Sequence, residues 1–293
     1  MTEEKIHDIA IIGCGPAGLS AAVNASIRNT DLIVLGAKTY SPKLHKAPEV
    51  NNYLGIFDVS GKELMQKYLD HAEKMGITVN KAKIDNIYYD GNHYTLISSE
   101  QSYKAYALIL ALGVSNTKYL PGEEDFIGKG VSYCATCDGP LFKGKKVAVI
   151  AYSKEGIEEA EYLADIADSV YLLPQFDYQD NPKNNINIIN EKPEKIIGDN
   201  LVESIKLDNS KLDVDGIFII REVTPPDKLL MNLKLNDNHI AVNNNMETNL
   251  PGVYAAGDCT GTPYQISRAT GQGQTAGLNA ASFARKKKES KRG

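Results

Sequence analysis

A short apolar strand leads directly into a glycine-rich loop close to the start of the chain. Residues 8–12 read Asp-Ile-Ala-Ile-Ile, and Gly13-Cys-Gly-Pro-Ala-Gly18 follows at once. In a GxGxxG loop the first glycine makes a tight turn, the second (Gly15) lets backbone approach a pyrophosphate, and the third allows close helix–strand packing. The helix that follows offers amide donors and its positive dipole end to a phosphate. The loop therefore predicts a dinucleotide site, but it does not distinguish FAD from NAD.

The segments around this loop predict a βαβ unit, and the same pattern returns later in the chain. A helix is expected over 20–28 and a strand at 32–35, within the roughly 30 residues that the fingerprint requires. A second strand–helix–strand pattern occupies 145–150, 154–166 and 169–173. Because strands that alternate with helices indicate a parallel sheet, this pattern predicts a second α/β domain.

Motifs of the first domain resume at 250–258, so the second domain is expected to be inserted into the first. The loop-like segments 119–122 and 243–246 are candidate crossings between the two. We therefore expect a discontinuous cofactor-binding domain over 1–117 and 246–293, and an inserted domain over 118–245.

Composition and charge exclude several classes of protein. The chain has 293 residues, enough for two modest domains. Its net charge of -5 argues against a nucleic-acid partner. No apolar run approaches the roughly 20 residues of a membrane span, and the first residues show no apolar signal core. Four cysteines are too few for a secreted disulfide scaffold, so we expect a cytoplasmic protein.

The motif Cys134-Ala-Thr-Cys137-Asp138 predicts redox chemistry. In a CxxC pair one thiolate attacks and the other resolves, and a following helix N-terminus favours the thiolate. A partly buried carboxyl beside them is suited to proton transfer. A zinc site would need a second ligand pair, yet Cys14 belongs to the glycine loop and Cys259 stands alone. We therefore expect no metal, and we expect these other two cysteines to be small buried residues.

Four motifs occur in the order found in one known family. They are Gly13-Cys-Gly-Pro-Ala-Gly18, Glu49-Val-Asn-Asn-Tyr-Leu-Gly55, Cys134-Ala-Thr-Cys-Asp-Gly139 and Gly252-Val-Tyr-Ala-Ala-Gly-Asp258. With this arrangement the chain resembles the low-molecular-weight thioredoxin reductases over nearly its whole length. The resemblance implies an α/β fold with two Rossmann-like three-layer domains, the second inserted into the first. It also implies a bound FAD and a homodimer.

The same resemblance assigns the flavin site. Asn52 would lie near the flavin, and Asp258 would bind its ribityl or phosphate region. Gln265 and Ile266 would present backbone to the flavin ring at the start of a helix. The remaining implied contacts fall in the glycine loop and in small residues that follow strands: Gly13, Cys14, Gly15, Pro16, Ala17, Gly18, Gly36, Ala37, Ala82, Ala111, Gly113 and Gly257.

The adenosine end of this site departs from the usual pattern. Gly36-Ala37-Lys38 lacks the acidic residue that normally holds an adenosine ribose. We therefore expect mostly backbone contacts there, from Gly36, Ala37 and Ala82.

For the dithiol, the resemblance implies separate roles. Cys137 would face the flavin and exchange electrons with it, Cys134 would attack a protein disulfide, and Asp138 would shuttle the proton. Because the dithiol lies on the inserted domain and must reach both the flavin and a partner, we expect a rigid-body rotation with hinges near 118 and 245.

The second glycine loop is where the chain departs most from the family. Ordinary members have GxGxxA there and bind the NADPH pyrophosphate, whereas this chain has Ala151, Ser153 and Gly156. The two added Cβ atoms crowd the places where a phosphate approaches backbone, and Glu155 adds negative charge at the helix start. We therefore expect no NADPH binding.

Two further losses concern the same nucleotide. Pro-Gln-Phe at 174–176 stands where a basic run would hold the 2′-phosphate, and Ile-Arg-Glu at 220–222 replaces an Ala-Ile-Gly-like element. The chain thereby resembles the pyridine-nucleotide-independent branch of the family, the ferredoxin-dependent flavin thioredoxin reductases. This resemblance implies that electrons pass from reduced ferredoxin through FAD and the Cys134/Cys137 dithiol to thioredoxin.

Two alternatives remain open at this point. An FAD-dependent oxidase could pass electrons from a small dithiol to dioxygen. A flavin-bearing interaction protein could turn nothing over, although the intact CxxC motif argues against this.

An acidic ferredoxin would need a basic docking patch on this acidic chain. The candidates are the tail residues Lys286, Lys287, Lys288, Lys291 and Arg292, and the group Lys143, Lys145 and Lys146.

Overall fold

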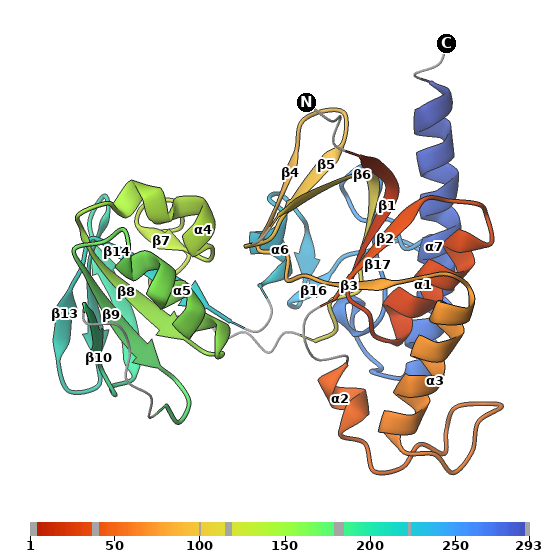
Figure 1. The fold of residues 1–293 in the computed structure, drawn as a ribbon, viewed down its shortest axis with the longest axis horizontal. Coiled ribbons are helices and arrows are strands. Elements are labelled where there is room, and N and C mark those ends of the chain that lie inside the picture. Colours follow the sequence, from red (N-terminus) through yellow and green to blue (C-terminus); the bar gives the residue numbers. More distant parts are fainter. Residues whose placement is uncertain are drawn as a thin grey trace. The chain divides into compact units, whose positions relative to one another are not determined.

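The computed structural model describes residues 5–36, 41–99, 101–114, 119–178, 185–221 and 224–290, apart from the side chains of Pro42 and Lys43. The chain forms two compact units (Figure 1). Unit 1 comprises Met1–Ser115 and Pro225–Gly293, and unit 2 comprises Asn116–Thr224. The chain returns from unit 2 to unit 1 at Pro225, which is earlier in the sequence than the expected segment 243–246. The reason is that Leu229, Leu230 and Ile240 are already buried in the core of unit 1.

A seven-stranded sheet forms the centre of unit 1. Six strands run in the order β3-β2-β1-β6-β5-β4, and β17 pairs in parallel with β6. Ile9 and Ile11 of β1 face one core cluster, while Ala10 and Ile12 face the other, as in a sheet that is covered on both sides. The strands are β1 (Ile6–Ile12), β2 (Leu32–Gly36), β3 (Val79–Lys81), β4 (Asn86–Tyr89), β5 (Tyr94–Ile97), β6 (Ser102–Leu110) and β17 (Val253–Ala255).

Three long helices pack on one face of this sheet, and short elements cover the other. The helix after the glycine loop begins at Pro16 rather than at residue 20, because the fixed φ of proline suits the first helical position. The elements are α1 (Pro16–Ser26), α2 (Pro42–His45), α3 (Gly61–Lys74), α6 (Pro226–Leu229), α7 (Ile266–Glu289), the 3₁₀ helix η2 (Asp258–Thr260), β15 (Leu235–Asn236) and β16 (His239–Ile240).

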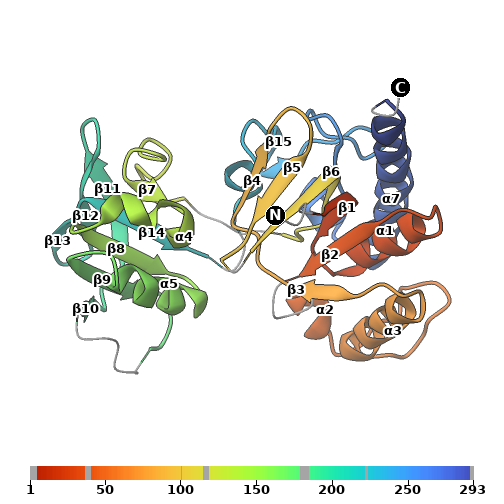
Figure 2. The same cartoon turned by 45° about the horizontal axis from the view of Figure 1, so that its top comes forward.

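Helices α1 and α7 lie side by side in both Figure 1 and Figure 2, and glycines make this contact possible. A Cβ on Gly273 would overlap the carbonyl oxygen of Ala17, and a Cβ on Gly277 would overlap that of Ala21. The backbone of α7 therefore lies directly against the helix that follows the glycine loop, and it fixes the position of that helix.

Gly273→Ala should destabilise unit 1 by about 1 to 3 kcal/mol, because the added methyl group forces the two helices apart. Gly271→Ala is the matched control, since a Cβ there meets nothing within 4 Å on the same helix. The control should be neutral or should stabilise by up to about 1 kcal/mol through helix propensity. Denaturant unfolding of the two variants measures the difference. Equal stability would contradict the close contact described above.

Unit 2 contains the second βαβ pattern. Its parallel sheet has the order β10-β9-β8-β14-β7, and α5 connects β8 to β9. The expected strands and helix are confirmed with ends shifted by one or two residues. The elements are β7 (Val131–Ser132), α4 (Ala135–Asp138), the 3₁₀ helix η1 (Gly139–Phe142), β8 (Lys146–Ala151), α5 (Glu155–Ala164), β9 (Ser169–Pro174), β10 (Ile186–Ile188) and β14 (Gly216–Ile220). An antiparallel sheet of β11 (Pro193–Gly198), β12 (Val202–Leu207) and β13 (Lys211–Asp213) packs beside it.

Candidate functional site

The glycine loop has the backbone that its sequence predicts. Gly13 has φ +108°, and a Cβ there would overlap the carbonyl oxygen of Ala111. A Cβ on Gly18 would overlap the carbonyl oxygen of Gly13. At Gly15, by contrast, a Cβ would meet nothing closer than Ser41 at 3.6 Å. The protein itself therefore requires two of the three glycines, and the middle one leaves room for a ligand.

The start of α1 is open to an anion. Its N-cap residue is Gly15, Pro16 occupies the first turn, and no side chain caps the helix. Free amide groups and the positive dipole end suit a pyrophosphate. These features fit the phosphate portion of FAD, with backbone rather than charged side chains as the donors.

A second turn of unit 1 carries Asp258. Gly257 has φ +85°, and its N–H donates to the Gln272 side chain at 2.9 Å. Arg268 donates to the carbonyl oxygen of Gly261 at 2.6 Å. These two side chains of α7 hold the turn that presents Asp258. Roles for Arg268 and Gln272 were not predicted from the sequence. Their spacing of four on a helix rich in small residues could have indicated that both face the same side of that helix.

The start of α7 is joined to the loop that contains Asn52. The helix begins at Ile266 with Gln265 as its N-cap, and no side chain caps it. The Asn52 side-chain amide donates to the Gln265 side-chain oxygen at 2.9 Å. Asn52 and Gln265, which are far apart in sequence, therefore lie together as the expected flavin contacts require.

The expected adenosine contacts gather at the end of β2. A Cβ on Gly36 would overlap the sulfur of Cys14, and the N–H of Ala82 donates to the Gly36 carbonyl at 3.0 Å. Two other expected contacts, Ala111 and Gly113, follow the end of β6. The N–H of Ala111 donates to the Ile12 carbonyl at 2.8 Å, and Gly113 has φ +72° with open space where a Cβ would lie. Ala37 lies outside the described residues.

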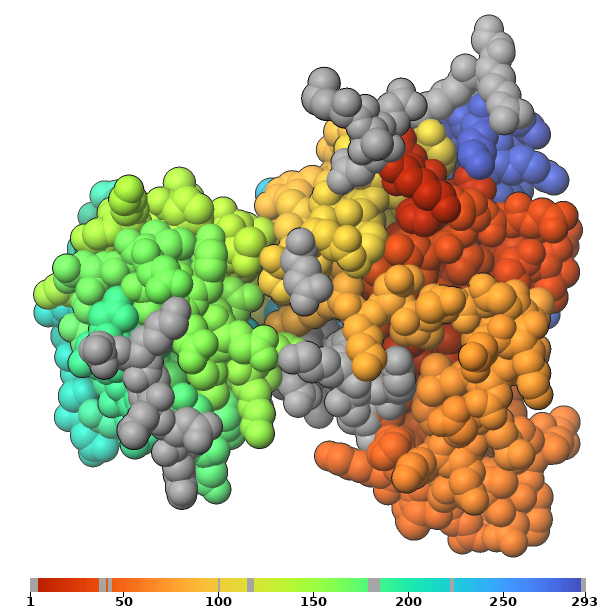
Figure 3. All heavy atoms as spheres, viewed as in Figure 1, coloured from red at the N-terminus to blue at the C-terminus, as the bar shows by residue number. Residues whose placement is uncertain are grey.

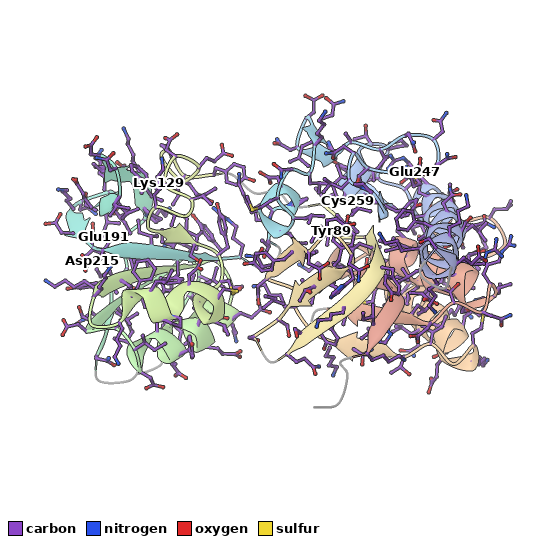
Figure 4. All side chains as sticks on the ribbon, turned by 90° about the horizontal axis from the view of Figure 1, so that it is seen from above. Tyr89, Lys129, Glu191, Asp215, Glu247 and Cys259 are labelled. Atoms are coloured by element: carbon purple, nitrogen blue, oxygen red, sulfur yellow. A yellow bond between two sulfur atoms is a disulfide. The ribbon has the colours of Figure 1, made fainter. Side chains whose placement is uncertain are left out.

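The two cysteines outside the CxxC motif are buried in unit 1, where Figure 4 labels Cys259. Burial raises the pKa of each thiol, Cys14 and Cys259, to about 11. Their thiolates therefore form only as the pH rises toward that value.

At pH 8, iodoacetamide should modify the half-buried Cys137 of the reduced protein and leave Cys14 and Cys259 intact. The buried pair should react only as the pH approaches 11 or after denaturation. Mass spectrometry of the alkylated peptides measures this. Rapid modification of Cys259 at pH 8 in the folded protein would show that the thiol is accessible.

Cys134 and Cys137 form a disulfide with a Cα–Cα distance of 5.3 Å. Cys134 is the N-cap residue of α4, and the N–H of Cys137 points at its sulfur from 3.1 Å. This amide would stabilise negative charge on the Cys134 sulfur after reduction. The residue is buried in the disulfide form, whereas Cys137 is half-buried.

Ser132 connects the acid to the dithiol turn. Its hydroxyl donates to the Asp138 carboxylate at 2.6 Å and accepts the N–H of Cys134 at 3.1 Å. No motif singled out Ser132, because its role depends on how the following turn folds. The carboxylate is thereby tied through Ser132 to the backbone of the dithiol turn, and a carboxyl group so placed is suited to proton transfer.

Ser132→Ala should slow exchange between the reduced dithiol and a protein disulfide by up to about 100-fold, because the carboxylate loses its orientation. Ser132→Thr keeps the hydroxyl and should retain most of the rate. In an Asp138→Asn background, itself slowed by about 10²- to 10⁴-fold, Ser132→Ala should add little. Stopped-flow measurements give the four rates. Independent, additive losses would show that Ser132 acts elsewhere.

The loop between β8 and α5 is unlike the glycine loop of unit 1. Ala151 and Ser153 are both buried, and a Cβ on Gly156 would lie 2.9 Å from the Ala151 Cα. Glu155 and Glu158 occupy the first turn of α5. Two acidic side chains at this helix start oppose the binding of a pyrophosphate.

No group of three or more residues suited to hold a metal occurs in the described part of the chain. Within the same residues, no helix is both long and apolar enough to cross a membrane.

An uncapped dinucleotide loop in one unit and a CxxC disulfide in another define a disulfide oxidoreductase with a bound dinucleotide cofactor. The chain belongs to the pyridine nucleotide-disulphide oxidoreductase family, whose model matches residues 7–273.

Comparison with similar proteins shows which kind of disulfide oxidoreductase the chain is. The thioredoxin reductase of Listeria monocytogenes is 35% identical over 99% of this chain and 97% of its own length. That of Bacillus subtilis is 34% identical over 94% of each chain. A solved ferredoxin-flavin thioredoxin reductase from Clostridium acetobutylicum is 46% identical, with a TM-score of 0.87 over 94% of this chain and 97% of that one. The chain is thus a flavoprotein disulfide oxidoreductase of the thioredoxin reductase type, with FAD as its cofactor. The expected family, fold class and cofactor are confirmed.

Proposed function

We propose that this protein takes electrons from reduced ferredoxin, and not from NADPH, and delivers them to the disulfide of thioredoxin. The observation that carries the proposal is the β8–α5 loop, which has Ala151 and Ser153 in place of two glycines and ends in a helix whose first turn carries Glu155 and Glu158. Negative charge at a helix start opposes the binding of a phosphate. The name of the Clostridium acetobutylicum relative supports a ferredoxin donor. FAD supplies a carrier that accepts electrons singly and releases them in pairs.

The residues of unit 2 then carry out the exchange. The Asp138 carboxylate takes the proton of the Cys134 thiol, and the resulting thiolate attacks one sulfur of the thioredoxin disulfide to form a mixed disulfide. Asp138 then returns this proton to the thiolate that leaves. The Cys137 thiolate attacks the Cys134 sulfur, which restores the Cys134–Cys137 disulfide and releases dithiol thioredoxin. Two electrons leave the protein for each turn, and two reduced ferredoxins replace them.

Docking of an acidic ferredoxin requires positive charge on this protein. The two basic clusters differ in the contacts that their lysine side chains make. In the tail, Lys288 pairs with Asp8 at 2.6 Å, while Lys286 is exposed. Lys291 and Arg292 lie outside the described residues. In the other cluster, Lys145 lies over the Phe142 ring at 5.5 Å, on the 3₁₀ helix that follows the CxxC motif. Both clusters remain candidates for the docking site.

A homodimer is the assembly that we propose. In Figure 3 the orange part of the unit 1 surface includes α3 and the loop before it. This loop exposes Leu54 (99%) and Phe57 (76%), more apolar surface than an isolated loop normally shows to water. A neighbouring groove of about 400 Å³ is lined by Ser20, Asn24, Tyr53, Leu54, Ser267, Thr270, Gly271 and Gln274.

Anaerobic titration tests the electron donor directly. Reduced ferredoxin should bleach the flavin and drive thioredoxin reduction, and NADPH should leave the flavin absorbance unchanged. Cys134→Ser is the control, because it should keep flavin reduction by ferredoxin and lose thioredoxin reduction. Bleaching by NADPH with turnover at ordinary rates would overturn the proposal. Peroxide formation from a small dithiol in air, without transfer to thioredoxin, would favour an oxidase.

A further inference from the structure

One residue of unit 2 stands at the place where a dinucleotide would bind. The chain leaves β8 through α5 to β9 on one side, while β14 lies on the other side of β8. The switch point of the sheet is therefore between β8 and β14, and ligands of such sheets bind in the crevice at the carboxyl ends of these strands. Arg221 directly follows β14, whose last residue pairs with Ala151 at the end of β8.

Arg221 is buried at this edge with a buried partner. Its two terminal nitrogens donate to the two carboxylate oxygens of Glu123, at 2.8 and 2.9 Å. Arg221 is 9% exposed and Glu123 0%. The guanidinium carbon lies 5.1 Å from the ring centre of Tyr152, the first residue of the altered loop. The strand ends are thus covered by a stacked guanidinium and ring.

Further donors complete the hydrogen bonding of Glu123. The Tyr133 hydroxyl donates to one carboxylate oxygen at 2.7 Å, and the N–H of Leu120 donates to the other at 2.8 Å. Burial, together with the charge of Glu123, raises the pKa of Tyr133, so its hydroxyl stays a donor. Burial alone would lower the pKa of Arg221, but the hydrogen bonds and charge of Glu123 outweigh it and raise the pKa.

We propose that Arg221, held by Glu123 and stacked on Tyr152, fills the switch-point crevice and is the specificity-determining residue that closes unit 2 to NADH as well as NADPH. This inference rests on the proposed function and deepens it. The guanidinium is already paired and does not serve as a phosphate ligand. Displacing it would strand a buried carboxylate, which is strongly unfavourable. Arg221 therefore excludes the nucleotide even where the loop itself would accept it.

Four FAD-loaded proteins distinguish the effect of the crevice on nucleotide binding from the effect of the loop. Ala151→Gly, Ser153→Gly and Glu155→Gln together restore the loop and remove the negative charge nearest the helix start, and Arg221→Gly with Glu123→Gln opens the crevice without leaving an unpaired charge. The set is completed by the wild type and the protein with all five substitutions. NADH and ADP-ribose are the probes, because the seat for a 2′-phosphate is missing in every case. Isothermal calorimetry should show binding at least tenfold tighter in the combined protein than in the loop-restored protein.

Arg221→Lys in the loop-restored protein keeps the positive charge opposite Glu123 but loses the paired hydrogen bonds and the planar group over Tyr152. It should bind the probes more weakly than the combined protein, because the buried charge pair is kept. Equal binding by the loop-restored and combined proteins would overturn the proposal. So would a combined protein that unfolds normally, reduces thioredoxin with ferredoxin and binds neither probe. If that protein does not fold, Arg221→Ala with Glu123→Gln in the restored loop takes its place under the same criteria. The donor proposal is judged separately, on the wild type with ferredoxin and NADPH.

Discussion

The packing of backbone on backbone around α1 is the contact on which unit 1 depends. Gly18 lies against the carbonyl of Gly13, and Gly273 of α7 lies against the carbonyl of Ala17, with no side chain between them. Because these contacts tolerate no Cβ, they lock the first strand, its helix and the last helix into one arrangement. The cofactor site thus results from close packing, which leaves the amide groups at the start of α1 uncapped and available to phosphate.

Unit 2 repeats this frame with a different outcome. Gly156 of α5 packs closely against Ala151, much as Gly18 packs in unit 1. The residues around this contact differ from those in unit 1. Acidic side chains occupy the first turn of α5, whereas the first turn of α1 has none, and a buried ion pair lies at the strand ends. Under the proposed function, the same arrangement of sheet and helix holds a dinucleotide in unit 1 and excludes one in unit 2, and the difference comes from a few side chains at the carboxyl edge of the sheet.

Much of this could be predicted where the information is local. Both βαβ units follow from apolar runs and glycine spacing, and the dithiol follows from a four-residue motif. The crossing at Thr224 was missed because α6, β15 and β16 are too short to show a period. Arg221 was noted only as part of the Ile-Arg-Glu segment that replaces an Ala-Ile-Gly-like element, because its partner Glu123 is 98 positions away and no local pattern joins them. Ser132 was missed for a different reason: its partners Cys134 and Asp138 are close in sequence, but the contacts depend on how the turn between them folds.

The ion pair at the strand ends also bears on whether the stability of unit 2 depends on a bound ligand. A domain that binds a nucleotide gains stability by mass action, in proportion to the logarithm of ligand concentration over Kd. Here the Glu123–Arg221 pair is covalently part of the domain and is present at full occupancy in every molecule. Under the exclusion of pyridine nucleotides proposed above, the stability of unit 2 gains nothing from these ligands and does not change with their concentration.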